Sequence, residues 1–348
     1  MNEKSMNVVP IGIIIAAVFC IILLGSCSAE QTGNDYGDGK IHILCTTFPI
    51  YDWTRQITRG LDEYFEITLL MDQGTDLHNY QPTAEDIILM SEADLLISIG
   101  GESDRWMEDV ISAVPEEKRA AQRHLELMDI LGDALREEEY VDGMEHSRGD
   151  EEDGSRREET EYDEHIWLSV KNAEFCVRAI GDAVWDMTVE ESVMQAAAGN
   201  TELYLEELKE LDREYADTLG QADGNMLIFG GRFPFLYLVK DYGLEYYAAF
   251  QGCSAETGAS FETIVFLAEK LDEYGLSAVL VIENEDSRVA STIIENTAGK
   301  DQIILALNSM QSITVKDIEQ GADYLGIMRD NLSVLSTALG TSYSETYN

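Results

Sequence analysis

Positive charge is scarce in this sequence. Its 348 residues include 23 Lys and Arg against 67 Asp and Glu, which gives a formal net charge of -44 at pH 7. Nucleic-acid binding depends on Lys and Arg contacts to phosphate, so the deficit excludes nucleic acid as a partner and disfavours tight contact with an anionic lipid surface. The negative charge would attract cations. It would also keep a secreted protein soluble, so charge alone does not identify a ligand.

Cysteine is scarce as well. The chain has five cysteines, and no two of them form a CxxC pair, so a cysteine zinc cluster is excluded. Cys20 and Cys27 belong to the N-terminal segment, which leaves Cys45, Cys176 and Cys253. These three are predicted to be buried free thiols. The sequence leaves their redox state open.

The N-terminus carries one long apolar run, Val8 to Leu24, followed by Gly25, Ser26 and Cys27. Small residues before a cysteine resemble the lipobox of a bacterial lipoprotein signal. We therefore predict a signal peptide over 1–26, lipidation of Cys27 and a polar tether over 27–40. The alternative is a plain transmembrane anchor, since about 17 residues approach the lower limit of a span. Both place the rest of the chain outside the cytoplasm and attach it to the cell membrane.

Strand-like and helix-like segments alternate along most of the remaining chain. Alternation of this kind predicts an α/β fold with parallel sheets flanked by helices. The series is interrupted by two helical stretches, the first of which has apolar residues at i, i+3 and i+4 spacing. We predict an N-terminal α/β lobe over 41–167, a long rigid linker helix over 168–188 and a C-terminal α/β lobe over 189–348.

A strongly acidic segment, 136–164, interrupts the first lobe. It contains very few apolar residues and many Asp and Glu. Such a composition cannot bury enough apolar surface to order a chain, so the segment is predicted to be a disordered acidic loop.

The stretch "MLIFGGRFPFLYLVKDYGL" raises a specific question. An apolar run ends in Gly230 and Gly231, and Arg232 follows. Ligand groups in α/β proteins lie where strands end, before a helix begins. An arginine at this position is unexpected in so acidic a chain.

Four segments together resemble one family. They are "TTFPIYDWTRQI", "GTDLHNYQPTAEDIILMSEADLLISIGG", "DEHIWLSVKNA" and "FPFLYLVKDYGL". They are similar to motifs of the substrate-binding lipoproteins of zinc and manganese ABC uptake transporters, the cluster A-I metal-binding family. The resemblance implies a monomeric receptor, not an enzyme, that captures Zn(II), with Mn(II) as the lesser alternative. It would deliver the ion to a membrane permease served by an ATPase.

The resemblance also implies four metal ligands, drawn from both lobes. His78 and His165 match the first two ligand positions, and neutral imidazole is a good zinc ligand. The third position, usually His or Glu, holds Arg232, whose guanidinium has no lone pair to give. The fourth, usually Asp, corresponds most simply to Asn308, which offers only a weak neutral oxygen.

Three explanations of the altered C-terminal positions stay open. In the first, Glu283 or Glu256 completes the shell. In the second, Arg232 binds an anion, so the ligand is a metal chelate or a metal with bound carboxylate or carbonate. In the third, metal binding is lost and Arg232 pairs with an acid such as Glu283.

Two rivals from other classes also remain. One is a zinc hydrolase that uses His78, His165, one carboxylate and a water, although no HExxH motif is present. The other is an adhesin or a receptor that does not transport. The sequence leaves the identity of the metal, its affinity and the complete ligand shell undetermined.

Overall fold

The computed structural model describes residues 39–75, 77–145, 161–252 and 258–343. Chain contacts separate Met1–Gly33 from Asn34–Asn348, and every described residue belongs to the second unit. The predicted signal peptide, Cys27, Cys253 and Glu256 lie outside the described residues.

The first sheet has four parallel strands in the order β2-β1-β3-β4. They are β1 (Ile41–Cys45), β2 (Phe65–Leu69), β3 (Leu95–Ser98) and β4 (Arg123–Glu126). The prediction of a parallel sheet is confirmed. The sequence pattern did not reveal β4, because this strand lies at the sheet edge and, apart from Leu125, its half-buried or exposed residues are polar.

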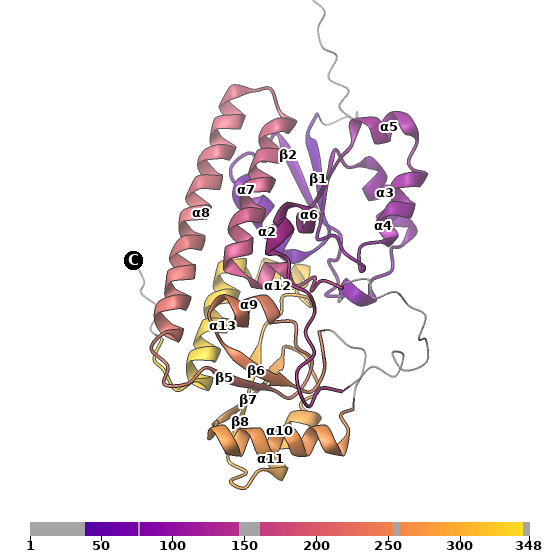
Figure 1. The fold of residues 1–348 in the computed structure, drawn as a ribbon. Coiled ribbons are helices and arrows are strands. Elements are labelled where there is room, and N and C mark those ends of the chain that lie inside the picture. Colours follow the sequence, from indigo (N-terminus) through magenta and orange to yellow (C-terminus); the bar gives the residue numbers. More distant parts are fainter. Residues whose placement is uncertain (1–38, 76, 146–160, 253–257, 344–348) are drawn as a thin grey trace, which may run out of the picture. The chain divides into compact units, whose positions relative to one another are not determined.

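Helices cover both faces of this sheet (Figure 1). One face, with Ile43 and Cys45, packs against α2 (Phe48–Ile57) and α6 (Leu127–Leu131). On the other face, Leu44 and Leu96 pack with α3 (Ala84–Glu92) and α4 (Trp106–Ala113), and α5 (Glu116–Ala121) follows α4. Alternate strand residues point to opposite faces, which is why each face has its own cluster.

The second sheet repeats the topology in the order β6-β5-β7-β8, again all parallel. Its strands are β5 (Met226–Phe229), β6 (Glu245–Ala248), β7 (Ala278–Ile282) and β8 (Ile303–Leu307). One face packs on α10 (Phe261–Tyr274) and α11 (Arg288–Asn296), and the other on α9 (Leu236–Asp241) and α13 (Tyr324–Ala338). A short helix, α12 (Val315–Glu319), precedes α13.

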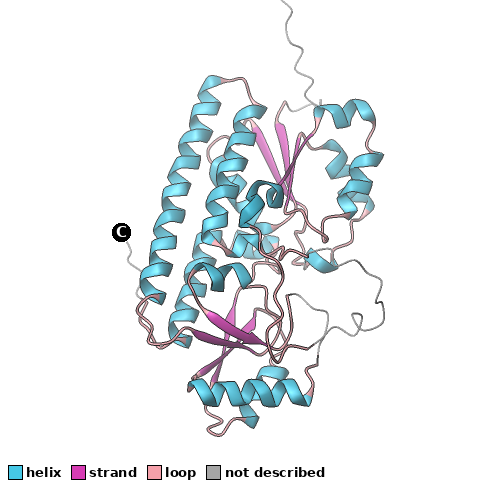
Figure 2. Ribbon diagram, in the orientation of Figure 1, coloured by secondary structure: helices cyan, strands magenta, loops and turns pink. Residues whose placement is uncertain are grey.

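Two long helices, which stand side by side in Figure 2, connect the two sheets along the sequence. They are α7 (Val170–Met187) and α8 (Glu191–Leu219). The Ser169 hydroxyl caps α7 by accepting from the Asn172 amide. Helix α8 packs along α7 and also contacts α2 and α13. A helix of its 29 residues is about 43 Å long, which is enough to brace elements from both sheets.

The acidic segment is more ordered than predicted. Both of its described ends form a short antiparallel pairing: the Glu138 amide donates to the Glu161 carbonyl at 3.0 Å, and the Asp163 amide donates to the Arg136 carbonyl at 2.9 Å. Met144 is also buried. The prediction of disorder was wrong for 136–145 and 161–164, because composition does not show that backbone pairing can order acidic residues. The centre of the segment, 146–160, lies outside the described residues.

Two of the predicted buried thiols are confirmed. Cys45 and Cys176 are free and fully buried, and burial raises the pKa of each thiol to about 12. Both are therefore inert thiols at neutral pH.

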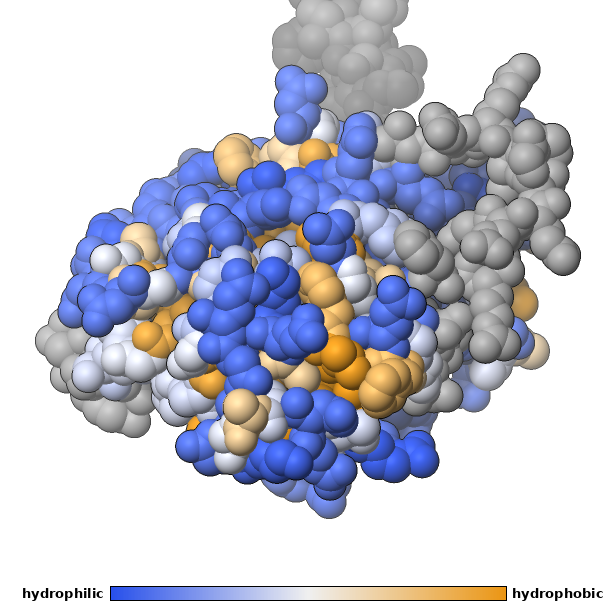
Figure 3. All heavy atoms as spheres, turned by 60° about the horizontal axis from the view of Figure 1, so that its bottom comes forward, coloured by the Kyte–Doolittle hydropathy of each residue, from blue (hydrophilic) through white to orange (hydrophobic). Residues whose placement is uncertain are grey.

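The surface matches the composition. The face drawn in Figure 3 is mainly hydrophilic, with hydrophobic residues gathered in small patches. Within the described part of the chain, no helix is both long enough and apolar enough to cross a membrane.

Candidate functional site

Two histidines from distant parts of the sequence meet ring to ring. His78 lies in a short 3-10 helix after β2, Leu77–Asn79, and His165 lies just before another, Ile166–Leu168. Their Nε2 atoms are 3.3 Å apart. Two nitrogen ligands at about 2.0–2.1 Å from a tetrahedral Zn(II) are separated by about 3.3 Å. The spacing of the two imidazoles therefore matches that of two ligands of one zinc ion.

Each imidazole is oriented through its other ring nitrogen. His165 Nδ1 lies 3.0 Å from an Asp163 carboxylate oxygen, which also accepts from the His165 amide at 2.8 Å. His78 Nδ1 lies 2.7 Å from the Ser103 hydroxyl. A carboxylate can only accept, so His165 carries its proton on Nδ1 and presents the Nε2 lone pair to its neighbour.

Glu164 holds Ser103 in position beside His78. This buried carboxylate accepts from the Ser103 amide at 2.9 Å, and its other oxygen lies 3.7 Å from His78 Nδ1. Gly101 makes the approach possible: its φ is +86°, and a Cβ there would collide with the Glu164 carboxylate. The loop after β3 thus fixes Ser103, and Ser103 fixes the ring of His78.

The two glycines before Arg232 have a packing role. A Cβ on Gly230 would lie 2.7 Å from the Ala290 Cβ and 2.8 Å from a Val279 side-chain carbon, and one on Gly231 would overlap the Glu285 carboxylate. The close approach of α11 and the Glu285 side chain to the end of β5 therefore requires glycine at both positions.

Arg232 lies against Glu285. Its amide donates to Glu285 Oε1 at 3.3 Å, and its guanidinium Nε is 3.7 Å from the same oxygen. Burial raises the pKa of Glu285, and the hydrogen bond and charge of Arg232 oppose that rise. The acid beside Arg232 is thus Glu285 and not Glu283, the example predicted from the sequence.

Glu283 and Asn308 are engaged in holding the loop after β8. The Glu283 carboxylate accepts from the Ser309 amide at 2.7 Å and from the hydroxyls of Ser309 and Ser312 at 2.8 and 3.1 Å. Asn308 Oδ1 accepts from the Met310 amide at 2.8 Å, while its backbone pairs in both directions with the Asn331 side chain. Neither side chain is placed beside the histidine pair by these contacts.

Across the described ranges, no three His, Cys, Asp or Glu side chains are arranged to hold a metal ion. The structure brings together His78 and His165 but adds neither Glu283 nor Asn308 to them, and Glu256 falls outside the description.

One carboxylate that the sequence analysis missed lies near the pair. Glu138 accepts from the Gln251 side-chain amide at 2.6 Å, and burial raises its pKa to about 7. Repulsion by Asp163 adds to this rise, while the charges of His165 and His78 oppose it. Glu138 stands among many acids in the printed sequence, so no local signal distinguishes it. The orienting role of Asp163, by contrast, is suggested by its position two residues before His165.

Comparison with known proteins places the chain in a family. The family profile described as "Zinc-uptake complex component A periplasmic" matches residues 43–338. The zinc-binding lipoprotein AdcA of Streptococcus pneumoniae strain R6 is 26% identical over 323 residues, which cover 92% of this chain and 60% of that protein. The high-affinity zinc uptake system protein ZnuA of Bacillus subtilis is 24% identical over 327 residues, covering 94% and 96%.

Solved structures share the fold. The Zn(II)-bound ZnuA-like domain of Streptococcus pneumoniae AdcA superposes with a TM-score of 0.65 at 24% identity, covering 86% of this chain and 99% of that one. The periplasmic zinc-binding protein TroA of Treponema pallidum gives 0.64 at 19% identity, covering 86% and 99%.

The chain spans about 60% of the length of the first curated relatives it matches. Its family profile nevertheless covers both sheets and the helices between them. The resemblance drawn from the sequence motifs is confirmed: the chain belongs to the family of the zinc-uptake complex component A.

Proposed function

We propose that this protein is an extracytoplasmic receptor that captures Zn(II) and delivers it to an ABC permease and its ATPase. The observation that carries the proposal is the 3.3 Å separation of the His78 and His165 Nε2 atoms. In the ion-free pair one Nε2–H can donate to the other Nε2, and a Zn(II) ion would take the place of that proton between the two rings. Membership of a family described as a zinc-uptake component supports the transport role.

The donor set favours zinc over manganese. Imidazole nitrogen suits Zn(II), whereas Mn(II) prefers oxygen ligands. We assign His78 and His165 as metal ligands. Glu138 lies near both rings, so its carboxylate is a candidate for a third ligand. Glu256, Glu283 and Asn308 are weaker candidates. Of these, Glu283 and Asn308 would have to leave the hydrogen bonds they now make.

Metal titration of the full-length chain in detergent tests the proposal. One Zn(II) per chain is expected, with at least 100-fold weaker binding in His78→Ala and in His165→Ala. His42→Ala, a substitution on β1, is the matched control and should bind as the parent does. Equal zinc binding by all four proteins would refute a site at the histidine pair.

A second candidate function is binding of a metal chelate or a metal-anion pair. Arg232 favours it, because its guanidinium can fork onto a carboxylate or carbonate. Zinc titrations with and without added bicarbonate or citrate distinguish the two functions. An anion that tightens zinc binding in the parent but not in Arg232→Ala would establish the chelate function, and anion-independent binding would exclude it.

We also propose that Cys27 is lipidated after removal of 1–26 and that the protein is held at the outer surface of the cell membrane. The apolar run ending in Gly25, Ser26 and Cys27 supports this. Metabolic labelling with a fatty acid should mark the parent protein and leave Cys27→Ser unlabelled. Labelling of both would locate the lipid elsewhere.

A further inference from the structure

The segment 136–145, here called the strap, follows the first sheet in sequence but is attached to elements around the second sheet. The Glu145 amide donates to the carbonyl of Ala249, just beyond β6, at 3.0 Å. The Glu145 carboxylate accepts from the Ser260 amide at the start of α10, where a negative charge is favourable. Met144 beside it is buried in the apolar core. The far end of the strap is therefore fixed to the second sheet and its helices.

A tight turn brings this end of the strap against α10. The Met144 amide donates to the Val141 carbonyl at 3.2 Å, and Gly143, the third residue of the turn, has a φ of +85°. A turn of this type favours glycine at its third position. A Cβ on Gly143 would overlap the ring of Phe266 on α10. Glycine is thus required twice, for the turn and for the close approach to α10.

The middle of the strap brings Glu138 near the histidine pair. The Glu138 carboxylate accepts from the Gln251 side-chain amide at 2.6 Å, and a Cβ on Gly252 would lie 3.3 Å from its Oε1 atom. Gln251 and Gly252 follow Ala249 in the loop after β6. The loop that accepts the end of the strap therefore also holds the Glu138 side chain.

The first residue of the strap supports Asp163. The Asp163 amide donates to the Arg136 carbonyl at 2.9 Å, and the Arg136 amide donates to the hydroxyl of Tyr237 on α9 at 3.1 Å. That hydroxyl in turn donates to the Asp163 carbonyl at 2.9 Å. Because the Asp163 carboxylate orients His165, the orientation of this ring depends on contacts between the strap and the second sheet's helices.

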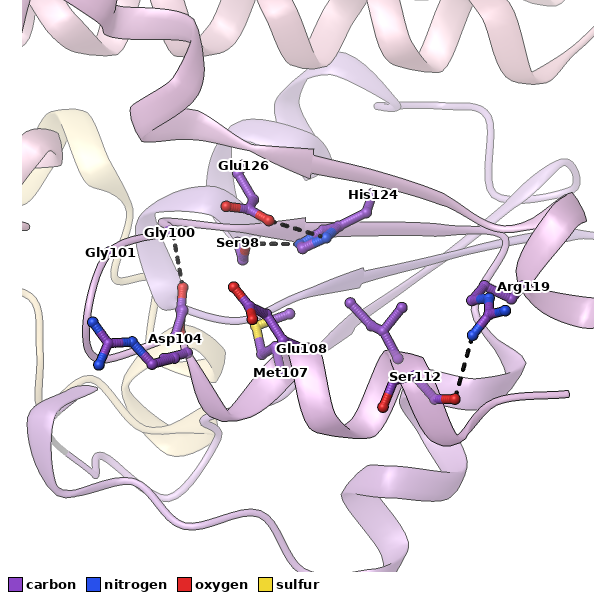
Figure 4. Close-up of a pocket in the computed structure, with 12 residues that line it drawn as sticks. Ser98, Gly100, Gly101, Asp104, Met107, Glu108, Ser112, Arg119, His124 and Glu126 are labelled. Carbon is purple, nitrogen blue, oxygen red and sulfur yellow. Dashed lines mark hydrogen bonds and ion pairs between the residues drawn. The ribbon is translucent and has the colours of Figure 1, made fainter. Parts of the chain in front are cut away.

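The support of His78 does not pass through the strap. The loop after β3 is braced within itself, since the Gly100 amide donates to the Asp104 carboxylate at 3.0 Å (Figure 4). This loop carries Ser103, whose hydroxyl lies 2.7 Å from His78 Nδ1. Release of the strap should therefore disturb Glu138 and His165 and leave His78 in place.

We propose that the strap is a positioning element whose attachment to the second sheet and its helices holds Glu138 and Asp163 at the histidine pair and slows the loss of bound zinc. This role rests on the proposed function as a zinc receptor. Gly143 and Glu145 are positioning residues, because they act through the strap. Their loss should appear mainly in the rate of zinc dissociation, where most affinity differences between related complexes lie.

Stopped-flow mixing of the zinc-loaded, full-length chain in detergent with excess chelator measures that rate. Gly143→Ala drives a Cβ into the Phe266 ring and Glu145→Ala removes the contact to α10, so each should release zinc about 3- to 10-fold faster. Gly60→Ala is the matched control: its φ is +78°, but a Cβ there meets nothing within 4 Å. It should release zinc as the parent does.

A rescue experiment separates the collision from any other effect of the new methyl group. In a Phe266→Ala background no ring remains for the added Cβ to strike. Gly143→Ala should therefore change the rate there no more than Gly60→Ala changes it in the parent.

Hydrogen exchange of the zinc-free proteins, followed by mass spectrometry, tests the attachment of the strap itself. Peptides that cover 136–145 and 161–164 should exchange about 10-fold faster or more in Gly143→Ala and in Glu145→Ala, and as in the parent in Gly60→Ala. This measurement needs no zinc, so it decides the attachment even if the receptor function fails.

Unchanged exchange in both strap variants would overturn the attachment. Faster exchange without faster zinc release would overturn the positioning role. Circular dichroism melting shows whether each variant is folded, and because the two substitutions act on different contacts, failure of one variant to fold leaves the other as the test.

Discussion

The two sides of the candidate metal site differ in what their polar groups do. On the N-terminal side, each histidine is oriented through Nδ1 while its Nε2 points at the other ring. On the C-terminal side, Arg232, Glu283 and Asn308 make hydrogen bonds that hold their own loops together. The family resemblance implies that these positions form a ligand shell, but only on the N-terminal side are two ligand-type groups turned toward each other. A residue's position in the fold therefore does not by itself show that its side chain can bind a metal ion.

The strongest test of the N-terminal side is Asp163→Asn. An amide can turn its NH2 toward His165 and favour the wrong tautomer, so zinc affinity should fall about 10- to 100-fold. Competition with a chromophoric chelator measures the change. Asp133→Asn, an exposed acid of the same lobe, should bind zinc as the parent does. Unchanged affinity in Asp163→Asn would mean that Asp163 does not orient the ring.

The close packing around Gly230 on the C-terminal side predicts that a larger residue there lowers the stability of the fold. Gly230→Ala places a Cβ against Ala290 and Val279, and should lower the free energy of unfolding by about 2 kcal/mol through overpacking. Gly224→Ala is the matched control, since a Cβ there meets nothing within 4 Å. Thermal unfolding compares them. Equal stability of the two variants would show that α11 moves aside readily.

A third prediction concerns the introduction of a metal-binding side chain on the C-terminal side and its effect on zinc affinity. Arg232→His replaces a cation with a neutral donor at the position where the family resemblance implies a ligand, and should tighten zinc binding about 10-fold. Arg288→His, on the exposed start of α11, controls for the loss of one positive charge. If Arg232→His binds no better than this control, the position lies out of reach of the ion.

The proposed role of Glu138 calls for a smaller effect. Glu138→Gln keeps the shape and removes the charge, and should weaken zinc binding about 3- to 10-fold. Glu139→Gln is the control, because Glu139 pairs with Lys240 instead. Equal affinity of the two variants would remove Glu138 from the shell while leaving the histidine pair intact.

A separate effect concerns the buried carboxyl group of Asp104 on the N-terminal side. The pKa of Asp104 is raised from 3.8 to about 7, so the folded protein holds this proton more tightly than the unfolded chain does. Stability from this group is present at low pH and is lost as the pH rises from about 4 to about 7. Asp104→Asn cannot ionise, so relative to the parent it should gain on the order of 2–3 kcal/mol between pH 5 and pH 8. Chemical denaturation at both pH values measures the gain, and a pH-independent difference would contradict it.

The sequence by itself determined the alternation of strands and helices, the two parallel sheets and the family, because each depends on local apolar patterns or contiguous motifs. It also identified His78 and His165, which lie inside such motifs. It missed β4, whose polar edge residues lack a strand pattern, and the pairing that orders the ends of the acidic segment.

Only the tertiary structure decided which side chains contact the two histidines and Arg232. It brought two histidines 87 residues apart to 3.3 Å, placed Ser103 behind one and Glu138 near both, and set Glu285 beside Arg232. These contacts join segments with no sequence relation to one another. Their geometry comes from how the helices and sheets pack, which no local pattern records.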